Sequence, residues 1–318
     1  MKEIGGYFGL EQFGGDEYYS DLIAVNTARN ALVYLIRSNR IKKLYIPYFL
    51  CGSVSDVCNR ECCSYEYYHI GKDFFPIFDK SLKNGEYLYV VNYYGMIDND
   101  QAVRLKKHYG NIILDNVQAF FQRPIKGIDT IYSCRKFFGV SDGGYVSTDA
   151  LLNEALPVDV SMDRMRHVLG RYEGKSASDY YGEFKANDHA FVGLELRSMS
   201  RLTHNILRAI NYEAIKQTRE ENFAFLHEKL GPLNSLKTNA PVGPYAYPFY
   251  CKNGMEIKKV LAQKKIFVAT LWPNVLEFDG CELEKDYAEN ILPLPCDQRY
   301  DTEDMKKVIE EVLECFKN

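Results

Sequence analysis

Lys136 is the residue whose type and position most directly suggest chemistry in this sequence. It follows Ile131-Tyr132, which reads as a short buried strand, and it precedes the Gly143-Gly144 turn into a second β-favouring run. Ligands bind at strand ends in α/β sheets, and apolar neighbours favour the neutral, nucleophilic amine of a lysine. Such an amine can form a Schiff base. This stretch alone leaves open the alternative of a surface lysine beside a β-turn.

An acid and an amide lie upstream of this lysine. Residues 111–115 read as a buried strand that ends on Asp115, and Gln118 follows three residues later. If Lys136 carries pyridoxal phosphate, the ring needs a carboxylate that keeps its pyridine nitrogen protonated, so that the ring acts as an electron sink. Asp115 is a candidate for that carboxylate. Its alternative role is the N-cap of the next helix, as an aspartate after a strand often takes that role.

These residues together resemble the motifs of a known family. Asp115-x-x-Gln118-Ala119, with Lys136 and then Asp142-Gly143-Gly144 beginning six residues later, is similar to the site motifs of DegT/StrS-type sugar aminotransferases. Residues 26–32 resemble the phosphate-binding turn of that family, and residues 291–295 resemble its late Leu-Pro motif. The resemblance covers nearly the whole chain.

The resemblance implies an α/β protein of fold type I. Its large domain would be a three-layer α/β/α structure like that of aspartate aminotransferase, with a mainly parallel sheet, followed by a smaller α+β C-terminal domain. We expect the large domain, with an N-terminal arm, to span residues 1–210 and the small domain residues 211–318. The resemblance also implies pyridoxal 5'-phosphate as cofactor, with Lys136 and Asp115 as catalytic residues and Gln118 near the phenolic oxygen of the ring.

The cofactor phosphate is expected at the start of a helix. Apolar residues recur at helical spacing from Asn26 onward, and the free N–H groups and positive dipole end of such a helix suit a phosphate. A capped amphipathic helix without a ligand is the alternative. The family more often has its phosphate-binding serine five residues before the lysine, whereas this chain has it three residues before, and Arg135 is a further candidate contact. The predicted phosphate-binding residues are Thr27, Ala28, Arg29 and Ser133.

Composition and charge exclude several classes of protein. The 318 residues are 46% hydrophobic and 26% charged, which is ordinary for a globular protein, and the net charge is −4. No basic excess attracts nucleic acid or an anionic membrane, and no apolar run approaches the ~18 residues of a membrane span.

Nine cysteines and a start without an apolar signal region indicate free thiols in a reducing cytoplasm. Cys58-x3-Cys62-Cys63 has no second cysteine pair nearby, so no metal site is expected.

Strands that alternate with helices indicate a parallel sheet covered by helices. Residues 159–188 read as a polar, irregular region, and residues 201–230 read as long helical structure that links the two domains. The other expected elements are strands at 86–94, 245–251 and 267–269 and helices at 102–109, at 255–264 and from Asp301 onward.

Three functions remain compatible with these observations. The first is an aminotransferase, in which Lys136 holds the cofactor and an amino group passes from a donor such as glutamate to a keto-sugar nucleotide or related carbonyl substrate. The second is another pyridoxal-phosphate reaction on the same fold, such as that of a lyase or decarboxylase. The third is a non-enzymatic binding module that keeps the fold. Lys136, Asp115 and Gln118 together favour an enzyme.

The resemblance implies a homodimer whose active site lies at the subunit interface, because fold type I enzymes of this kind complete their sites with loops from the neighbouring subunit. The aromatic, glycine-rich arm of residues 5–19 and the 159–188 region offer surface that one small domain could hardly bury alone. The substrate is not defined by the sequence. Arg299 is a candidate for binding the donor carboxylate, and either Tyr48 or Phe49 is a candidate for stacking on the cofactor ring.

Overall fold

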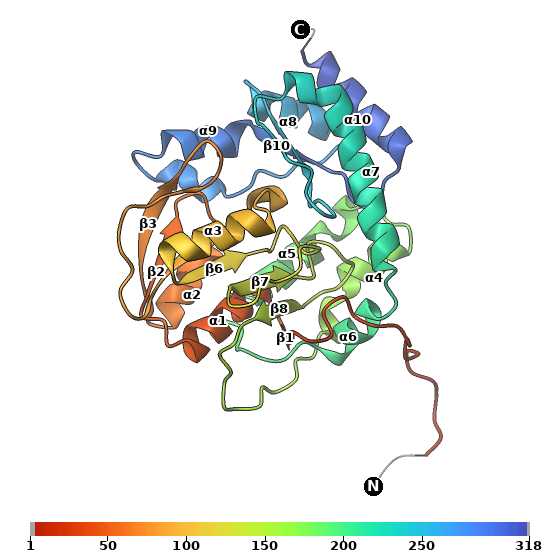
Figure 1. Ribbon diagram of the computed structural model, residues 1–318. Coiled ribbons are helices and arrows are strands. Elements are labelled where there is room, and N and C mark those ends of the chain that lie inside the picture. Colours follow the sequence, from red (N-terminus) through yellow and green to blue (C-terminus); the bar gives the residue numbers. More distant parts are fainter. Residues whose placement is uncertain (1–3, 317–318) are drawn as a thin grey trace.

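The computed structural model describes residues 4–316, and its centre is an eight-stranded sheet with the strand order β1-β8-β7-β6-β5-β2-β3-β4 (Figure 1). Pairing is parallel from β3 through β2, β5 and β6 to β7, whereas β8, β1 and β4 join antiparallel. This arrangement confirms the expected α/β class with a mainly parallel sheet. The strands are β1 Ile23–Val25, β2 Lys43–Pro47, β3 Ser64–Ile70, β4 Pro76–Ile77, β5 Glu86–Val91, β6 Ile112–Asp115, β7 Asp129–Ser133 and β8 Gly144–Ser147.

Helices cover both faces of this sheet (Figure 1). The chain passes from β2 through α2 to β3 in one direction across the sheet, and from β5 through α3 to β6 in the other. Because such crossovers are right-handed, the two directions place α2 and α3 on opposite faces. The chain therefore reverses between β2 and β5, where α/β proteins bind ligands beyond the carboxyl ends of the strands. The helices of this part are α1 Ala28–Ser38, α2 Ser53–Arg60, η1 Tyr93–Gly95 and α3 Asn99–Tyr109.

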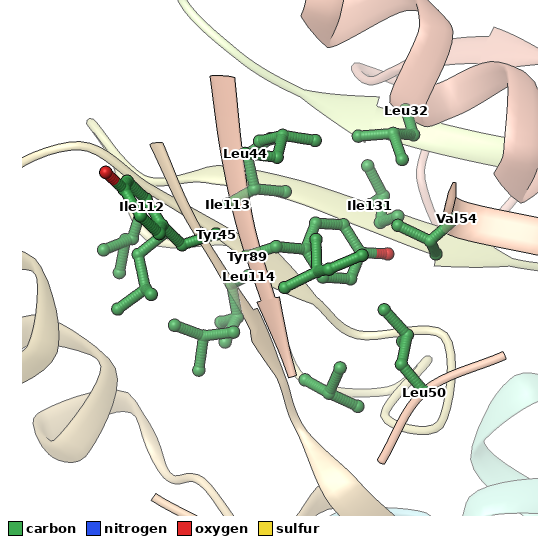
Figure 2. Close-up of a cluster of buried hydrophobic side chains, with 14 of the residues drawn as sticks. Leu32, Leu44, Tyr45, Leu50, Val54, Tyr89, Ile112, Ile113, Leu114 and Ile131 are labelled. Atoms are coloured by element: carbon green, nitrogen blue, oxygen red, sulfur yellow. The ribbon is translucent and has the colours of Figure 1, made fainter. Parts of the chain in front are cut away.

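The main core lies around the central strands. Leu88, Ile112 and Ile113 are fully buried, because helices cover both sides of these strands and apolar runs replace the alternation of a half-exposed sheet. Figure 2 shows side chains of β2, β5 and β6 packed together with Leu32 of α1 and Val54 of α2. This packing fixes the strand ends that carry the candidate site.

The 159–188 region differs from the expectation of irregular structure, because it contains two helices and two short 3-10 turns. The elements are η2 Met162–Arg164, α4 Arg166–Tyr172, η3 Ser178–Tyr180 and α5 Tyr181–Ala190. Several of their apolar side chains are exposed, for example Leu169 at 56% and Tyr172 at 88%. The sequence therefore lacks the one-sided apolar pattern by which a helix is recognised.

The C-terminal part packs around a second core. α6 Arg201–Leu207 and α7 Tyr212–Leu230 replace the single long helical run expected, and the remaining elements are η4 Gly231–Leu233, β9 Tyr247–Tyr250, α8 Gly254–Gln263, η5 Pro273–Glu277, α9 Glu282–Asn290, β10 Ile291–Leu294 and α10 Thr302–Glu314. Residues 267–269 form no strand, and β9 pairs antiparallel with β10, so that Pro248 lies opposite Pro293. The buried residues of this core run from Phe223 to Val312. The domain division at residues 210 and 211 stays a prediction.

The N-terminal arm extends away from the body beside α6 (Figure 1). Tyr7 and Phe8 are 98% and 96% exposed. The arm is fastened where Asn205 of α6 accepts a hydrogen bond from the Phe13 N–H and donates one to the Glu11 carbonyl, at 2.9 and 2.8 Å. No helix between residues 4 and 316 is long and apolar enough to cross a membrane.

Candidate active site

The candidate site lies where β5, β6 and β7 end. Because these strands are parallel neighbours, their carboxyl ends meet at one edge of the sheet. Asp115 is the last residue of β6 and pairs with Ile131 of β7. Lys136 lies in the turn three residues after β7 ends, and its positive charge is close enough to Asp115 to lower the pKa of that carboxyl group. The fold therefore brings the two predicted catalytic residues together.

The Asp115 carboxylate is buried and held by two donors. The Tyr89 hydroxyl donates to Oδ2 at 2.8 Å, and the Val117 N–H donates to Oδ1 at 2.9 Å. Burial raises the pKa of Asp115, while the bonds from Tyr89 and Val117 and the charge of Lys136 act in the opposite direction. The contact with Val117 closes a turn, and no helix begins between β6 and β7, so Asp115 is not the helix N-cap that the sequence left open. An ionised carboxylate has further lone pairs, so these two bonds leave room for a third donor.

Gln118 presents a buried donor without a partner. Its Oε1 accepts the Tyr94 N–H at 2.8 Å, and its Nε2 is buried and makes no hydrogen bond within residues 4–316. Tyr94 has φ of 56°, a left-handed conformation that is uncommon for a side chain of this size and that often marks functional sites. A buried N–H group without an acceptor is costly. An acceptor atom on a bound molecule would satisfy it.

The predicted phosphate cradle is formed by α1, β7 and β8. Thr27 caps α1, and its hydroxyl accepts the Asn30 N–H at 3.0 Å. Gly144 of β8 packs directly beneath this start: a Cβ there would lie 2.9 Å from both the Ala28 nitrogen and the Thr27 carbonyl carbon. Ser133 is the β7 partner of Gly144 and is 7% exposed. Ser133 and the first turn of α1 are therefore neighbours.

Two arginines add positive charge beside this cradle. Arg29 and Arg135 both contact the carboxylate of Asp188 on α5, at 3.5 Å and 3.3 Å. Both guanidinium groups also lie over the Phe191 ring. Burial lowers the pKa of Arg135, and the contact with Asp188 opposes that effect. The two guanidinium groups share one carboxylate, so a net positive charge remains for an anionic ligand. Asp188 was not anticipated from the sequence.

The loop that carries Lys136 is anchored by residues the sequence did not single out. The Phe137 carbonyl accepts hydrogen bonds from Gln298 Nε2 at 2.7 Å and from Arg219 Nη2 at 3.4 Å. Arg219 is 2% exposed, and its Nη1 donates to the Pro244 carbonyl at 2.7 Å. The Lys136 amine lies 5.3 Å from the centre of the Tyr245 ring. Arg219 thus links the loop around Phe137, which carries Lys136, to the segment around Pro244 and Tyr245, which lies beside the lysine amine.

Other predicted residues lie in less suitable positions. Arg299 forms a two-pronged ion pair with Asp297, with contacts of 2.7 and 2.8 Å, so its guanidinium is already neutralised. Tyr48 stacks on Tyr67, and Phe49 is fully buried beside other aromatic rings. A cavity of about 930 Å³ lies between the arm and α6 and is lined by neither Lys136 nor Asp115. The candidate site therefore rests on the arrangement of side chains rather than on cavity size.

Comparison with known proteins gives a clear result for the fold. No protein-family model matches the sequence, and no curated protein resembles it significantly in sequence. Solved structures match over most of the chain. A DegT DnrJ EryC1 StrS aminotransferase from Brucella abortus superposes with a TM-score of 0.61 and 13% identity, covering 92% of this chain and 85% of that chain.

Two further structures were solved with bound ligands. DesV of S. venezuelae, in complex with a ketimine intermediate, has a TM-score of 0.63 and 18% identity over 92% of this chain and 84% of that chain. NtdA from Bacillus subtilis, with bound cofactor PMP, has a TM-score of 0.67 and 13% identity, covering 93% of this chain and 73% of that chain. Identities this low establish a common architecture and leave function to be argued from the site. The chain therefore has the fold of these proteins, the one its motifs led us to expect.

Proposed function

We propose that this protein is a pyridoxal-phosphate-dependent aminotransferase. The observation that carries the proposal is the placement of Lys136 and the buried Asp115 at the ends of neighbouring parallel strands. The unpaired Gln118 Nε2 and the close approach of Gly144 to the start of α1 fit the same cofactor. Structural similarity to proteins solved with a ketimine intermediate and with PMP supports it further.

The residues of the site fit the cofactor group by group. Thr27, Ala28, Arg29 and Ser133 would hold the phosphate through the N–H groups of the first helical turn, a hydroxyl and a guanidinium. Asp115 would accept a hydrogen bond from the protonated pyridine nitrogen. The free Nε2 of Gln118 would donate to the phenolic oxygen. When bound, the cofactor supplies an electron sink for the α-carbon of an amino acid.

Lys136 would have two roles in this reaction. Its amine would attach the cofactor covalently, and after an amino donor takes its place the freed amine would carry a proton to and from the substrate Cα. Lys136 is exposed, so both roles are open to a substrate arriving from solvent. The hydrogen bonds from Gln298 and Arg219 to the next residue, Phe137, hold the backbone of the lysine loop in place while its side chain moves.

The amino acceptor is proposed to be a keto-sugar nucleotide or a related carbonyl compound. Support comes from similarity to sugar aminotransferases, including PseC of Helicobacter pylori, which is described as involved in the biosynthesis of pseudoaminic acid and matches with a TM-score of 0.60 at 14% identity. Arg29 lies in the first turn of α1 and Arg135 lies two residues after Ser133, so both add positive charge beside the proposed phosphate cradle. The donor is proposed to be an amino acid such as glutamate.

A homodimer with a shared active site is part of the proposal. Apolar side chains of the 151–192 region are exposed to an unusual degree, and the arm adds Tyr7 and Phe8. An obligate interface of this kind would bury on the order of 2,000 Å² or more. Light scattering tests the proposal: a species near the chain mass of 36.7 kDa that keeps cofactor and activity would contradict it. The exposed residues are Leu151, Val158, Val160, Met162, Leu169, Tyr172, Tyr181, Phe184 and Val192.

Borohydride reduction tests the function directly. The protein is incubated with pyridoxal phosphate and reduced, and the labelled peptide is identified by mass spectrometry. We expect the label on Lys136, loss of the label in Lys136→Ala, and an unchanged label in the control Lys126→Ala, which alters another exposed lysine. A label on a different lysine would refute the site, and no label at all would favour the binding module.

An amino-donor screen then separates the two enzymatic alternatives. A transaminase converts the bound cofactor to pyridoxamine phosphate when it is given its amino donor, and the change is visible in the absorbance spectrum. A protein labelled on Lys136 that never makes this conversion, but releases carbon dioxide or eliminates a group from the amino acid, would instead be a decarboxylase or lyase.

A further inference from the structure

A second cluster of reactive side chains lies between the large sheet and α9. It consists of His69 near the end of β3, Cys281 at the N-cap of α9, and Glu284 in the first turn of that helix. One ligand atom from each residue, an imidazole nitrogen, the thiol Sγ and a carboxylate oxygen, lies within 4.8 Å of the other two. None of these residues belongs to the site described above.

Two members of this cluster are buried without a strong positive partner. Cys281 is fully buried and Glu284 is 2% exposed. The Glu284 Oε1 lies 3.0 Å from His69 Nδ1 and accepts the Ile70 N–H at 3.1 Å. One imidazole and one amide are modest compensation for a buried carboxylate, which normally has a full set of charged or hydrogen-bonding partners or a metal ion.

The charges around the thiol are also mainly negative. The carboxylates of Glu284, Glu282 and Asp279 lie around the thiol, and Lys285 is the one cation among these neighbours. A metal cation placed here would be stabilised by this negative surrounding, and the thiol would bind it as a thiolate.

We propose that His69, Cys281 and Glu284 bind a divalent transition-metal ion, with zinc as the natural occupant. The donor set of one imidazole nitrogen, one thiolate and one carboxylate oxygen is typical of zinc, and three protein ligands leave a fourth position for water. Bond lengths of ~2.0–2.3 Å place tetrahedral ligand atoms about 3.3–3.8 Å apart, so closure requires side-chain shifts of about 1 Å.

The surroundings support the ligands in that geometry. The Tyr48 ring packs on the His69 imidazole with a centroid separation of 4.7 Å, and the Ile70 N–H orients the Glu284 carboxylate, as supporting residues do around metal ligands. The His69 side chain is 45% exposed, which gives an ion a path from solvent. Cys281 and Glu284 are three positions apart on α9, so both face the same way. The bound ion would fasten α9 to β3, the strand next to the edge strand β4.

Cobalt(II) substitution tests the proposal without reference to enzymatic activity. The full-length protein is treated with a chelator, and cobalt(II) is then added while the difference spectrum is recorded. We expect an intense thiolate-to-cobalt absorption in the near ultraviolet and the visible bands of four-coordinate cobalt, both removed by added zinc. Wild-type protein that shows neither feature has only a His69–Glu284 contact at this place, and the proposal is then wrong.

Single substitutions assign the ligands. Cys281→Ser should abolish the thiolate band, and His69→Gln should weaken cobalt binding by more than the roughly 10–100-fold that loss of a supporting residue causes. His69 is half-exposed, so this second variant tests the site even if a change at buried Cys281 disturbs folding. Cys62→Ser is the matched control, because Cys62 is exposed and lies outside the cluster. A band that survives both ligand substitutions, or disappears in the control, would overturn the assignment.

Discussion

Tyr89→Phe removes a single hydroxyl group from the candidate active site. That hydroxyl donates to Asp115 at 2.8 Å between side chains that are 1% and 8% exposed. A buried hydrogen bond to a charged group contributes about 1.5–3 kcal/mol, and phenylalanine keeps the ring, so no large cavity adds to the loss. We therefore expect the free energy of unfolding at neutral pH to fall by about 2 kcal/mol.

The pH dependence of this loss identifies its cause. Burial places the pKa of Asp115 above its value in the unfolded chain, and loss of the Tyr89 bond, which lowers that pKa, should raise it further. The ionised carboxylate needs the donor and the protonated form needs it much less. The difference in the free energy of unfolding between wild type and Tyr89→Phe should therefore be largest at pH values well above the folded-state pKa of Asp115. It should shrink as the pH falls through that pKa.

Urea unfolding of the cofactor-free protein tests this reasoning when it is measured at about pH 8 and at about pH 3, because the lower value lies below the ordinary pKa of an aspartate and therefore below the raised pKa of Asp115. The same substitution in an Asp115→Asn background closes a double-mutant cycle, and we expect it to cost clearly less there. An equal loss at both pH values, or an equal loss in both backgrounds, would show that the hydroxyl acts through packing and not through the carboxylate.

Three further substitutions test the cofactor contacts and their support. Asp115→Asn should leave cofactor binding in place but lower turnover by roughly two orders of magnitude or more, because the pyridine nitrogen loses the carboxylate that keeps it protonated; unchanged single-turnover rates would refute the assignment. Gly144→Ala should lower the free energy of unfolding by about 1–3 kcal/mol and weaken cofactor binding, since the new Cβ would lie 2.9 Å from backbone atoms at the start of α1. Gly9→Ala is the control, because a Cβ at Gly9 meets nothing within 4 Å. Arg219→Met should lower the melting temperature and slow borohydride-trapped labelling of Lys136, because the Pro244 carbonyl loses its donor and Gln298, which still donates to the Phe137 carbonyl, loses the Arg219 contact that positions it. Labelling at the wild-type rate in a folded variant would show that Arg219 is purely structural.

Much of the fold and part of the site could be predicted because the signals are local. Lys136 and Asp115 each follow a short apolar run, and the end of a strand in a parallel sheet is a place where ligands bind. Tyr89 could not be assigned in this way. It acts on Asp115 because Val91 pairs with Asp115, and a residue two positions before Val91 faces the same side of the sheet. That relation depends on the register between β5 and β6, which the sequence does not state.

Arg219 and the proposed metal site show a second reason why the sequence alone could not predict every functional residue. An arginine in a long helix is usually exposed, and the burial of Arg219 depends on carbonyl groups that come from the loops around Phe137 and Pro244. His69 and Cys281 are far apart in the chain, so no ligand spacing could indicate them. α4 and α5 were missed for a different reason, since their exposed apolar residues give no one-sided pattern.

The two prolines that face each other in the small sheet protect it from unwanted association. Pro248 lies opposite Pro293, and since neither has an N–H, this pair must be one of the non-hydrogen-bonded pairs of the ladder, whose backbone groups point outward. Each strand of the ribbon therefore lacks a donor in the middle of its outer edge. A strand from another molecule cannot complete a regular ladder there. On the β9 side, Asn234 also donates to the Pro248 carbonyl at 2.9 Å and the Ser235 N–H donates to the Tyr250 carbonyl at 2.9 Å, so the ribbon is a poor template for aggregation.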